Sequence, residues 1–366
     1  MLLSRRKYII VGAIGLAVAG IGVYGISLSG SFIWDDTVLV ANNTYIKSLK
    51  NIPVFFRGDV TSDSKSRDCH FYRPLQMITY AIDYAIWWLN PLGYRITNLL
   101  LHLGASVALW WLVFLLCSGR FLAFTTSFLF LIHPIQCGAV AYISGRSDPL
   151  AALFIFLCFS LYIKAQRTRT RWPACLMALT YIAALMSRET SLIVPGLIVL
   201  YHYAFKIRLQ GKYFAVVMLI SLLYGILKMT LGHEHLTHLM YTSTVVQRIP
   251  GFFVALTRYL RLLVFPVPLH MEYGNVLFPY SDVRVVIGAV ILLCGLAYAL
   301  RQRNGIVSFA GLWFFAALIP VSNLYPLNAY MAEHWLYVPS AGFFILVAAA
   351  LHPEYRRKKS RATALC

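Results

Sequence analysis

The chain has 366 residues, of which 60% are hydrophobic and 12% charged, against roughly 25% charged in a typical soluble domain. This composition and a mean hydropathy of +0.69 exclude an ordinary soluble enzyme, a disordered chain and a disulfide scaffold, and the continuous apolar runs exclude a membrane β-barrel. Much of the net charge of +19 lies in short breaks between apolar runs, as it does on the cytoplasmic side of membrane proteins, so we predict no nucleic-acid partner.

The first apolar run, residues 8–28, follows three basic residues and is long enough to span a bilayer. It has the outline of a signal peptide but no convincing cleavage site, so we expect a retained helix whose N-terminus is cytoplasmic. Residues 29–94 are charged and polar at first, and their apolar run 75–89 is short and interrupted by Asp83. We expect 29–94 to be one long outer loop whose helices lie at the membrane surface.

Nine further spans are predicted after this loop, in alternating directions. They are 95–117, 121–135, 149–163, 172–186, 190–205, 213–230, 283–300, 305–320 and 337–352. Residues 231–282 form a second outer segment, in which Arg258 and Arg261 make the run 251–265 more typical of a helix lying on the membrane. We therefore predict an all-α polytopic membrane protein, with a single domain of about ten transmembrane helices over 1–352 and a basic cytoplasmic tail at 353–366.

The acidic residues provide an independent check of this topology. Eighteen of the 32 Lys and Arg residues fall on the inner side, whereas Glu354 is the one acid among 13 placed there. The other acids fall on the outer side or at outer ends of spans. Ionisable groups at membrane depth are costly unless they are paired or functional, so we expect the chemistry on the outer face.

The first candidate site residues lie in the long outer loop. Asp35 and Asp36 are adjacent carboxylates just beyond the first span, where they can accept a proton from a hydroxyl or hold a cation. Taken alone, such a pair is more often a solvated loop feature. Arg73 ends the loop where a lipid phosphate would lie, and guanidinium binds phosphate bidentately. The alternative is an arginine that reaches toward lipid headgroups without a specific ligand.

Three later outer connections supply further polar candidates. In the loop 133–148, an Arg146–Asp148 ion pair that caps the next helix is the structural alternative to a binding role. Near residue 335, aromatic neighbours suggest either a site wall or an interfacial belt. The candidates from these connections are His133, Arg146, Asp148, Arg188, Glu189, Glu333, His334 and Tyr337.

No metal or other cofactor is predicted. The histidines at 233, 235 and 238, with Glu234, resemble a metal site only loosely, because such short spacings occur readily by chance. A divalent cation is conceivable beside the Asp pair, but nothing in the sequence supports one.

The outer segments also carry motifs in a characteristic order. The motifs are F-x-W-D-D at 32–36, Y-R-P-L at 72–75, G-Y-x-x-x-N-x-x-x-H at 93–102, H-P-x-x-x-x-A-V-x-Y-I-x-G-R-x-D at 133–148, S-R-E at 187–189 and A-E-x-W-L-Y-x-P-S-x-G-F at 332–343. Over about residues 30–350 this order resembles the membrane part of the transmembrane and tetratricopeptide-repeat O-mannosyltransferases and their bacterial relatives, which are GT-C-type glycosyltransferases.

The resemblance implies transfer of mannose or a similar hexose from a polyprenyl-phosphate donor to a protein or glycolipid acceptor on the periplasmic or lumenal face. It implies catalytic roles for Asp35 and Asp36, with the donor phosphate facing Arg73, Arg146 and Arg188. The residues that would shape the site are His133, Asp148, Glu189, Glu333, His334 and Tyr337.

Three departures separate this chain from the family pattern. Gly138 stands where the family usually has Glu, and His334 stands where it usually has Arg. We also expect the family's repeat domain to be absent from this chain. A catalytically reduced relative that serves as a structural or lipid-binding subunit of a membrane complex is therefore the alternative function. For the location, we expect a bacterial inner membrane rather than the endoplasmic reticulum.

Overall fold

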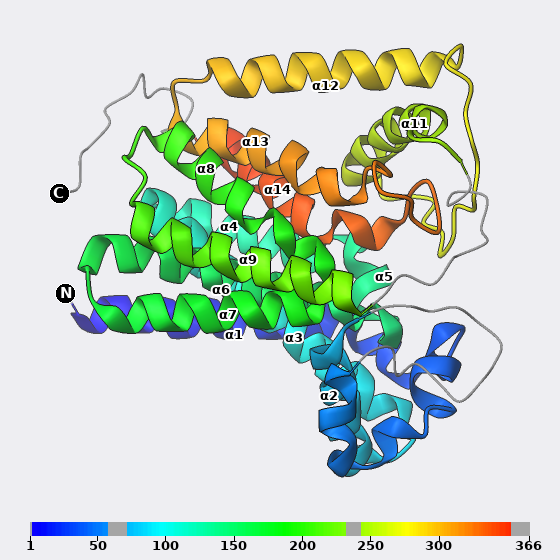
Figure 1. Cartoon of the computed structure of the whole chain (residues 1–366). Coiled ribbons are helices and arrows are strands. Elements are labelled where there is room, and N and C mark those ends of the chain that lie inside the picture. Colours follow the sequence, from blue (N-terminus) through cyan, green and yellow to red (C-terminus); the bar gives the residue numbers. More distant parts are fainter. Residues whose placement is uncertain (1, 58–71, 232–242, 353–366) are drawn as a thin grey trace.

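The computed structural model describes residues 2–57, 72–231 and 243–352, and every regular element within these ranges is helical (Figure 1). The α-helices are α1 (Leu2–Tyr24), α2 (Pro74–Trp87), α3 (Pro91–Cys117), α4 (Arg120–Ile132), α5 (Cys137–Val140), α6 (Ser147–Thr168), α7 (Arg171–Ser187), α8 (Val194–Phe205), α9 (Gly211–Thr230), α11 (Val245–Val264), α12 (Val283–Arg301), α13 (Gly305–Leu318) and α14 (Tyr337–Leu351).

Local sequence signals fix several helix ends. The side chains of Asn90, Asp282 and Asn304 each accept a hydrogen bond from the backbone N–H two residues on, at the starts of α3, α12 and α13. Pro91 occupies the first position of α3, where its missing N–H costs nothing. Because of this cap, α3 begins four residues before the predicted span, inside what we had assigned to the outer loop.

Each of the ten predicted spans coincides with a helix. Six helices are long and apolar enough to cross a membrane, and the pair Arg120–Ile132 and Pro134–Val140, bent by 56°, would form a seventh. The segments Glu189–Phe205 and Gly305–Val321 are shorter apolar helices. The predicted all-α membrane fold is confirmed, whereas the number ten stays a prediction.

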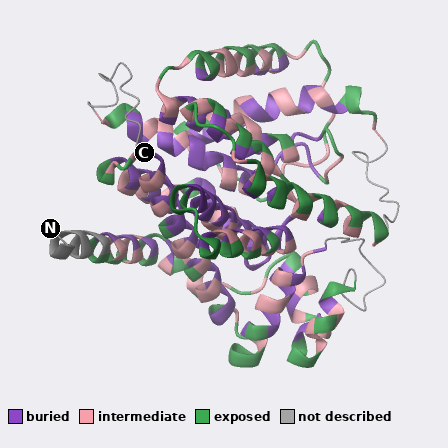
Figure 2. Cartoon of the chain, turned by 60° about the vertical axis from the view of Figure 1, so that its left-hand side comes forward, coloured by how far each residue is buried: buried purple, intermediate pink, exposed green. Residues whose placement is uncertain are grey.

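The buried core lies where the long helices run side by side across Figure 1. α3, α4, α6, α13 and α14 supply most of the fully buried aromatic and aliphatic side chains. Figure 2 shows buried residues in the middle of the bundle, while α12 at the upper edge is mostly exposed or half-buried. In a membrane, the exposed apolar side of α12 would face lipid.

The first outer loop folds into a small lobe with its own core, at the lower right of Figure 1. Val40, Ile46 and Phe55, from short helical turns, pack against Met77 and Tyr80 of α2. The predicted helix in this loop is thus present, as α2. Side chains of α2 are buried in the core of the lobe rather than exposed to solvent.

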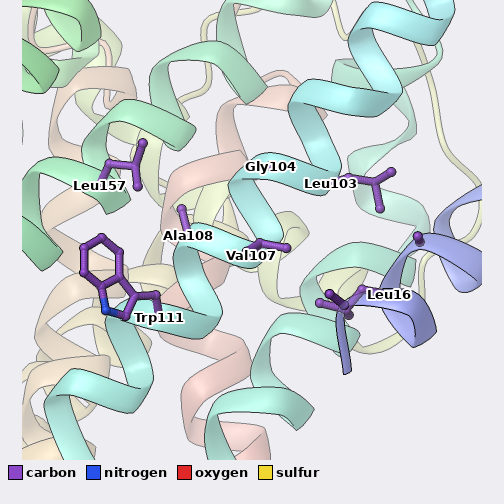
Figure 3. Close-up of a pocket in the computed structure, with 9 residues that line it drawn as sticks. Leu16, Leu103, Gly104, Val107, Ala108, Trp111 and Leu157 are labelled. Atoms are coloured by element: carbon purple, nitrogen blue, oxygen red, sulfur yellow. The ribbon is translucent and has the colours of Figure 1, made fainter. Parts of the chain in front are cut away.

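A groove of about 490 Å³ lies between α1, α3 and α6, lined by apolar residues (Figure 3). Leu16 of α1, Leu103 and Trp111 of α3, and Leu157 of α6 form its walls. No side chain in this lining can bind or transfer a proton, so the groove is not a candidate reaction site.

We expect Gly342→Ala to destabilise the fold, because α13 and α14 pack backbone against backbone at this glycine. A Cβ there would press on the carbonyl of Ala310 and lie 2.9 Å from the backbone nitrogen of Phe314. Overpacking of this kind costs about 1–3 kcal/mol. Gly225→Ala in α9 is the control, since a Cβ there meets nothing within 4 Å and alanine favours helix. Thermal unfolding in detergent should show a lower midpoint for Gly342→Ala alone.

Candidate active site

The two adjacent acids after α1 have opposite environments. Asp35 is exposed, and its carboxylate makes no hydrogen bond or ion pair to the described residues. Its backbone N–H donates to the hydroxyl of Tyr142 at 3.0 Å, which holds it against the loop before α6. Asp36 is fully buried. Of the predicted catalytic pair, therefore, Asp35 is the acid that a substrate can reach.

Asp36 joins the two outer loops. Its Oδ1 accepts from the N–H and hydroxyl of Ser144 at 2.8 and 2.6 Å, and its Oδ2 accepts from the N–H of Ile33 at 3.2 Å. Burial raises the pKa of Asp36, and these hydrogen bonds and Arg95 partly oppose that rise. This geometry is typical of a structural acceptor.

Arg146 is completely buried and surrounded by partners. Its guanidinium pairs with Asp83 at 2.5 Å, donates to Asn98 Oδ1 at 2.7 Å and to the Tyr94 carbonyl at 2.8 Å, and lies 4.5 Å from the ring centre of Tyr80. These contacts tie the loop before α6 to α2 and α3. Because these partners occupy the guanidinium group, Arg146 has little capacity to bind a phosphate. Its surroundings therefore do not support the predicted role in binding the donor phosphate.

Five residues at the helix ends predicted to be outer form a compact arginine–carboxylate cluster: Arg73, Ser147, Asp148, Arg188 and Glu189. Arg73 binds both Glu189 oxygens, at 2.9 and 3.3 Å, and Arg188 pairs with Asp148. The Ser147 hydroxyl lies 3.3 Å from both guanidinium groups and accepts from each. The structural alternative of an Arg146–Asp148 pair is wrong, because each residue is paired with a different partner.

The charges of the cluster balance within it. Burial alone would raise the pKa of Glu189, but the adjacent Arg73 holds it at about 2. Burial would likewise lower the pKa of Arg73, and Glu189 outweighs that effect and raises it. Both residues are therefore ionised at neutral pH. A phosphate that approached Arg73 or Arg188 would have to compete with a carboxylate already in place.

Gly138 and His334, the two departures from the family pattern, face each other. A Cβ built on Gly138 would lie 4.0 Å from His334 Cβ, an ordinary contact, so a side chain at 138 has room. His334 is within electrostatic reach of Arg188 and Arg73. The absent family acid would thus have lain beside the arginine–carboxylate cluster.

Glu333 points toward a different region from its neighbour His334. Its Oε1 accepts from the Tyr273 hydroxyl and the His270 N–H, both at 2.6 Å. His270 and Tyr273 line a second cavity of about 490 Å³, together with three arginines of which two belong to α11. Residues 333–334 therefore connect the arginine–carboxylate cluster to this cavity.

Two predicted site residues serve the scaffold. Tyr337 is buried and its hydroxyl pairs with His102 Nδ1, deep between α3 and α14. His133 caps the turn after α4 by accepting from the Ile135 N–H, and its other ring nitrogen bonds the Leu263 carbonyl of α11. Tyr337 nevertheless lies within electrostatic reach of Asp148, a member of the cluster.

Sequence reasoning missed several residues that build the site. Ser144 and Ser147 hold Asp36 and the two arginines, and Arg95 donates to the carbonyls of Ser31 and Ala141. The sequence around a serine or an arginine does not reveal these partners, because the partners lie in loops that are distant along the chain. Tyr273, which holds Glu333, was missed for the same reason.

Among the residues that the structure describes, no group of three or more His, Cys, Asp or Glu side chains is arranged to hold a metal ion. The histidines at 233, 235 and 238 lie outside those residues.

The chain is similar to curated protein O-mannosyl-transferases, although no family model matches it. It is 24% identical to F38B6.6 of Caenorhabditis elegans over 88% of this chain and 48% of the relative, and 25% identical to mouse TMTC3 over 89% and 40%. Human TMTC1 is 30% identical over 54% of this chain and 24% of the relative. The chain thus spans about half or less of the length of these relatives.

The structure resembles that of the Archaeoglobus fulgidus oligosaccharyltransferase tethered to an acceptor peptide. The TM-score is 0.51 at 12% identity, covering 96% of this chain and 50% of the other. The GT-C-type fold inferred from the motif order is confirmed, and so is the resemblance to the O-mannosyltransferases.

We expect Asp36→Ala to destabilise the protein and Asp35→Asn to leave its stability nearly unchanged. The first change leaves buried donors of Ser144 without an acceptor, at about 1–3 kcal/mol for each. The second alters an exposed group and should stay within about 0.5 kcal/mol. Thermal or denaturant unfolding in detergent measures both. Equal stability of the two variants would show that Asp36 does not join the loops as described.

Proposed function

We propose, from the similarity to the protein O-mannosyl-transferases, that this chain is a glycosyltransferase acting at the outer face of its membrane. The donor is a polyprenyl-phosphate-linked mannose or similar hexose, and the acceptor is a hydroxyl of a protein or glycolipid. The observation that supports this most directly is Asp35, an accessible carboxylate without a structural partner among the described residues, which Tyr142 holds in the loop predicted to be outer.

In the proposed reaction, the acceptor oxygen attacks the anomeric carbon from the face opposite the phosphate. Asp35 accepts the proton of the attacking hydroxyl as general base. The bond between the anomeric carbon and the phosphate oxygen breaks, and the phosphate leaves with the electron pair. The sugar is transferred with inversion, and no metal or cofactor is required by this scheme.

The arginine–carboxylate cluster suits a supporting role in this reaction. Arg73 and Arg188 are fixed by Glu189 and Asp148, so they present an ordered polar surface beside Gly138 and His334. Preorganised dipoles of this kind stabilise charge without reorganising during the reaction. Asp36 and Arg146 support the loops that hold Asp35 and Asp148.

The membrane that contains the protein is part of the proposal. A chain with several apolar helices is an integral membrane protein, with termini predicted to be cytoplasmic. The bacterial inner membrane stays a prediction, and the three relatives named above, all animal proteins, lend it no support.

We expect Asp35→Asn to lose transfer by roughly 10²–10⁴-fold, because the amide cannot accept the proton. The assay uses membranes or purified protein, a polyprenyl-phosphate-linked labelled mannose and lysate acceptors. The unfolding midpoint of the same preparation is the control for folding. Transfer at the wild-type rate would exclude Asp35 as the base.

Gly138→Glu separates a weakened enzyme from a subunit that has lost activity. The space at 138 admits the side chain, and its carboxylate would lie near His334. We expect Gly138→Glu to raise transfer severalfold, while Gly138→Gln, of equal size and without charge, does not. If neither the wild type nor the Glu variant binds or transfers the donor, the enzyme proposal fails, and a structural or lipid-binding subunit is the better description.

A further inference from the structure

Three arginines line the second cavity. Arg258 and Arg261 lie one turn apart on α11, and Arg284 faces them from the first turn of α12. His270 and Tyr273, from the segment that joins these helices, complete the lining. The sequence predicted α11 as a surface helix and gave its arginines no specific ligand.

The arginines of this cavity differ from those of the arginine–carboxylate cluster in their partners. Within the described ranges, Arg258 and Arg261 form no ion pair. Arg258 donates to the Tyr330 hydroxyl at 2.5 Å, and Arg261 donates to the Val267 carbonyl at 3.2 Å. Arg284 alone is paired, with Asp282. Arg258 also lies within electrostatic reach of Asp282. With three arginines against Asp282 and the nearby Glu333, the cavity keeps a net positive charge.

Glu333 lies behind the lining of the cavity and is already engaged. Its carboxylate accepts hydrogen bonds from Tyr273 and the His270 N–H, so it forms no ion pair with the arginines. A guanidinium group without a carboxylate partner binds phosphate strongly, with two parallel hydrogen bonds. About 490 Å³ accommodates a phosphate and adjoining groups.

The surroundings favour a phosphate that is attached to a lipid. Val264, Phe265 and Val267, beside the arginines, are 57%, 67% and 68% exposed. These side chains can contact an apolar lipid chain or the membrane, whereas a soluble nucleotide has no apolar chain that would bury them. Positive charge next to exposed apolar residues thus matches an anionic group on a membrane-embedded molecule.

We propose that this cavity, rather than the predicted set Arg73, Arg146 and Arg188, binds the phosphate of the polyprenyl-phosphate donor, through Arg258, Arg261 and Arg284. This assignment rests on the proposed function. Each arginine of the predicted set already has a carboxylate partner, so a phosphate there would displace an existing ion pair. Glu333 and His334, adjacent in sequence, place the cavity next to the arginine–carboxylate cluster.

The test measures binding of a polyprenyl monophosphate to the full chain in phosphatidylcholine nanodiscs, by titration with native mass spectrometry. Arg261→Gln is the main variant, because Arg261 is exposed and its loss disturbs little else. Arg258→Gln is the second variant. Arg208→Gln, an exposed arginine predicted on the opposite side, is the matched control.

We expect each cavity variant to bind about ten- to a hundredfold more weakly, as for the loss of a charge-assisted hydrogen bond, and Arg208→Gln to bind normally. The matching polyprenol without phosphate should bind weakly to all. Normal binding by Arg261→Gln, or loss of binding in Arg73→Gln alone, would overturn the proposal. So would phosphatidate that binds as tightly as the polyprenyl phosphate, since the cavity would then be a general anionic-lipid site.

The same variants separate this inference from the proposed function. If lipid binding depends on the phosphate and on Arg261 but no sugar is transferred, the binding-site proposal stands and the enzyme proposal fails. If Arg261→Gln and Arg258→Gln both transfer sugar at the wild-type rate, the enzyme proposal stands and the proposal of this phosphate site fails.

Discussion

Buried arginines bound by acceptors from distant segments organise the half of the fold that contains α2 and the loop before α6. Arg146 is the clearest case. An unpaired charge at its depth would cost several kcal/mol, so the chain surrounds it with Asp83, Asn98, the Tyr94 carbonyl and two aromatic rings. Those partners come from α2 and α3. Satisfying one arginine therefore fixes the outer lobe on the membrane helices.

The same requirement separates buried, engaged acids from an accessible one. Asp36 and Asp35 are neighbours in the chain, yet one is enclosed by Ser144 and the other is open to solvent. The buried acid holds two loops together, and this leaves the exposed acid in a defined position with its carboxylate unused. Arg73 and Arg188 are similarly held by Glu189 and Asp148. The arginine–carboxylate cluster is thus neutralised internally, whereas the adjacent cavity contains two arginines, Arg258 and Arg261, that form no ion pair within the described residues.

Residues 333–334 link these two regions. Glu333 faces the cavity through Tyr273, whereas His334 faces Gly138 and the two clustered arginines. A lipid-linked phosphate and a polar acceptor need different surroundings, one beside apolar residues and the other toward solvent. The short helical turn Glu333–Leu336 borders both regions.

The sequence by itself determined the all-helical membrane character of the chain, because long apolar runs are stable in a bilayer. Each predicted span coincides with a helix, and six of these helices, or seven with the bent pair, are long and apolar enough to cross a membrane. It also predicted Asp35, Arg73, Arg188 and Glu189 at outer helix ends, from the alternation of apolar spans and basic breaks, with the acidic residues as an independent check. Only the tertiary structure decided which charges meet. Arg146 pairs with Asp83, 63 positions away, and Asp148 with Arg188, rather than with each other. Such pairings depend on how the helices pack, and neither the composition nor the spacing of residues along the chain specifies that packing.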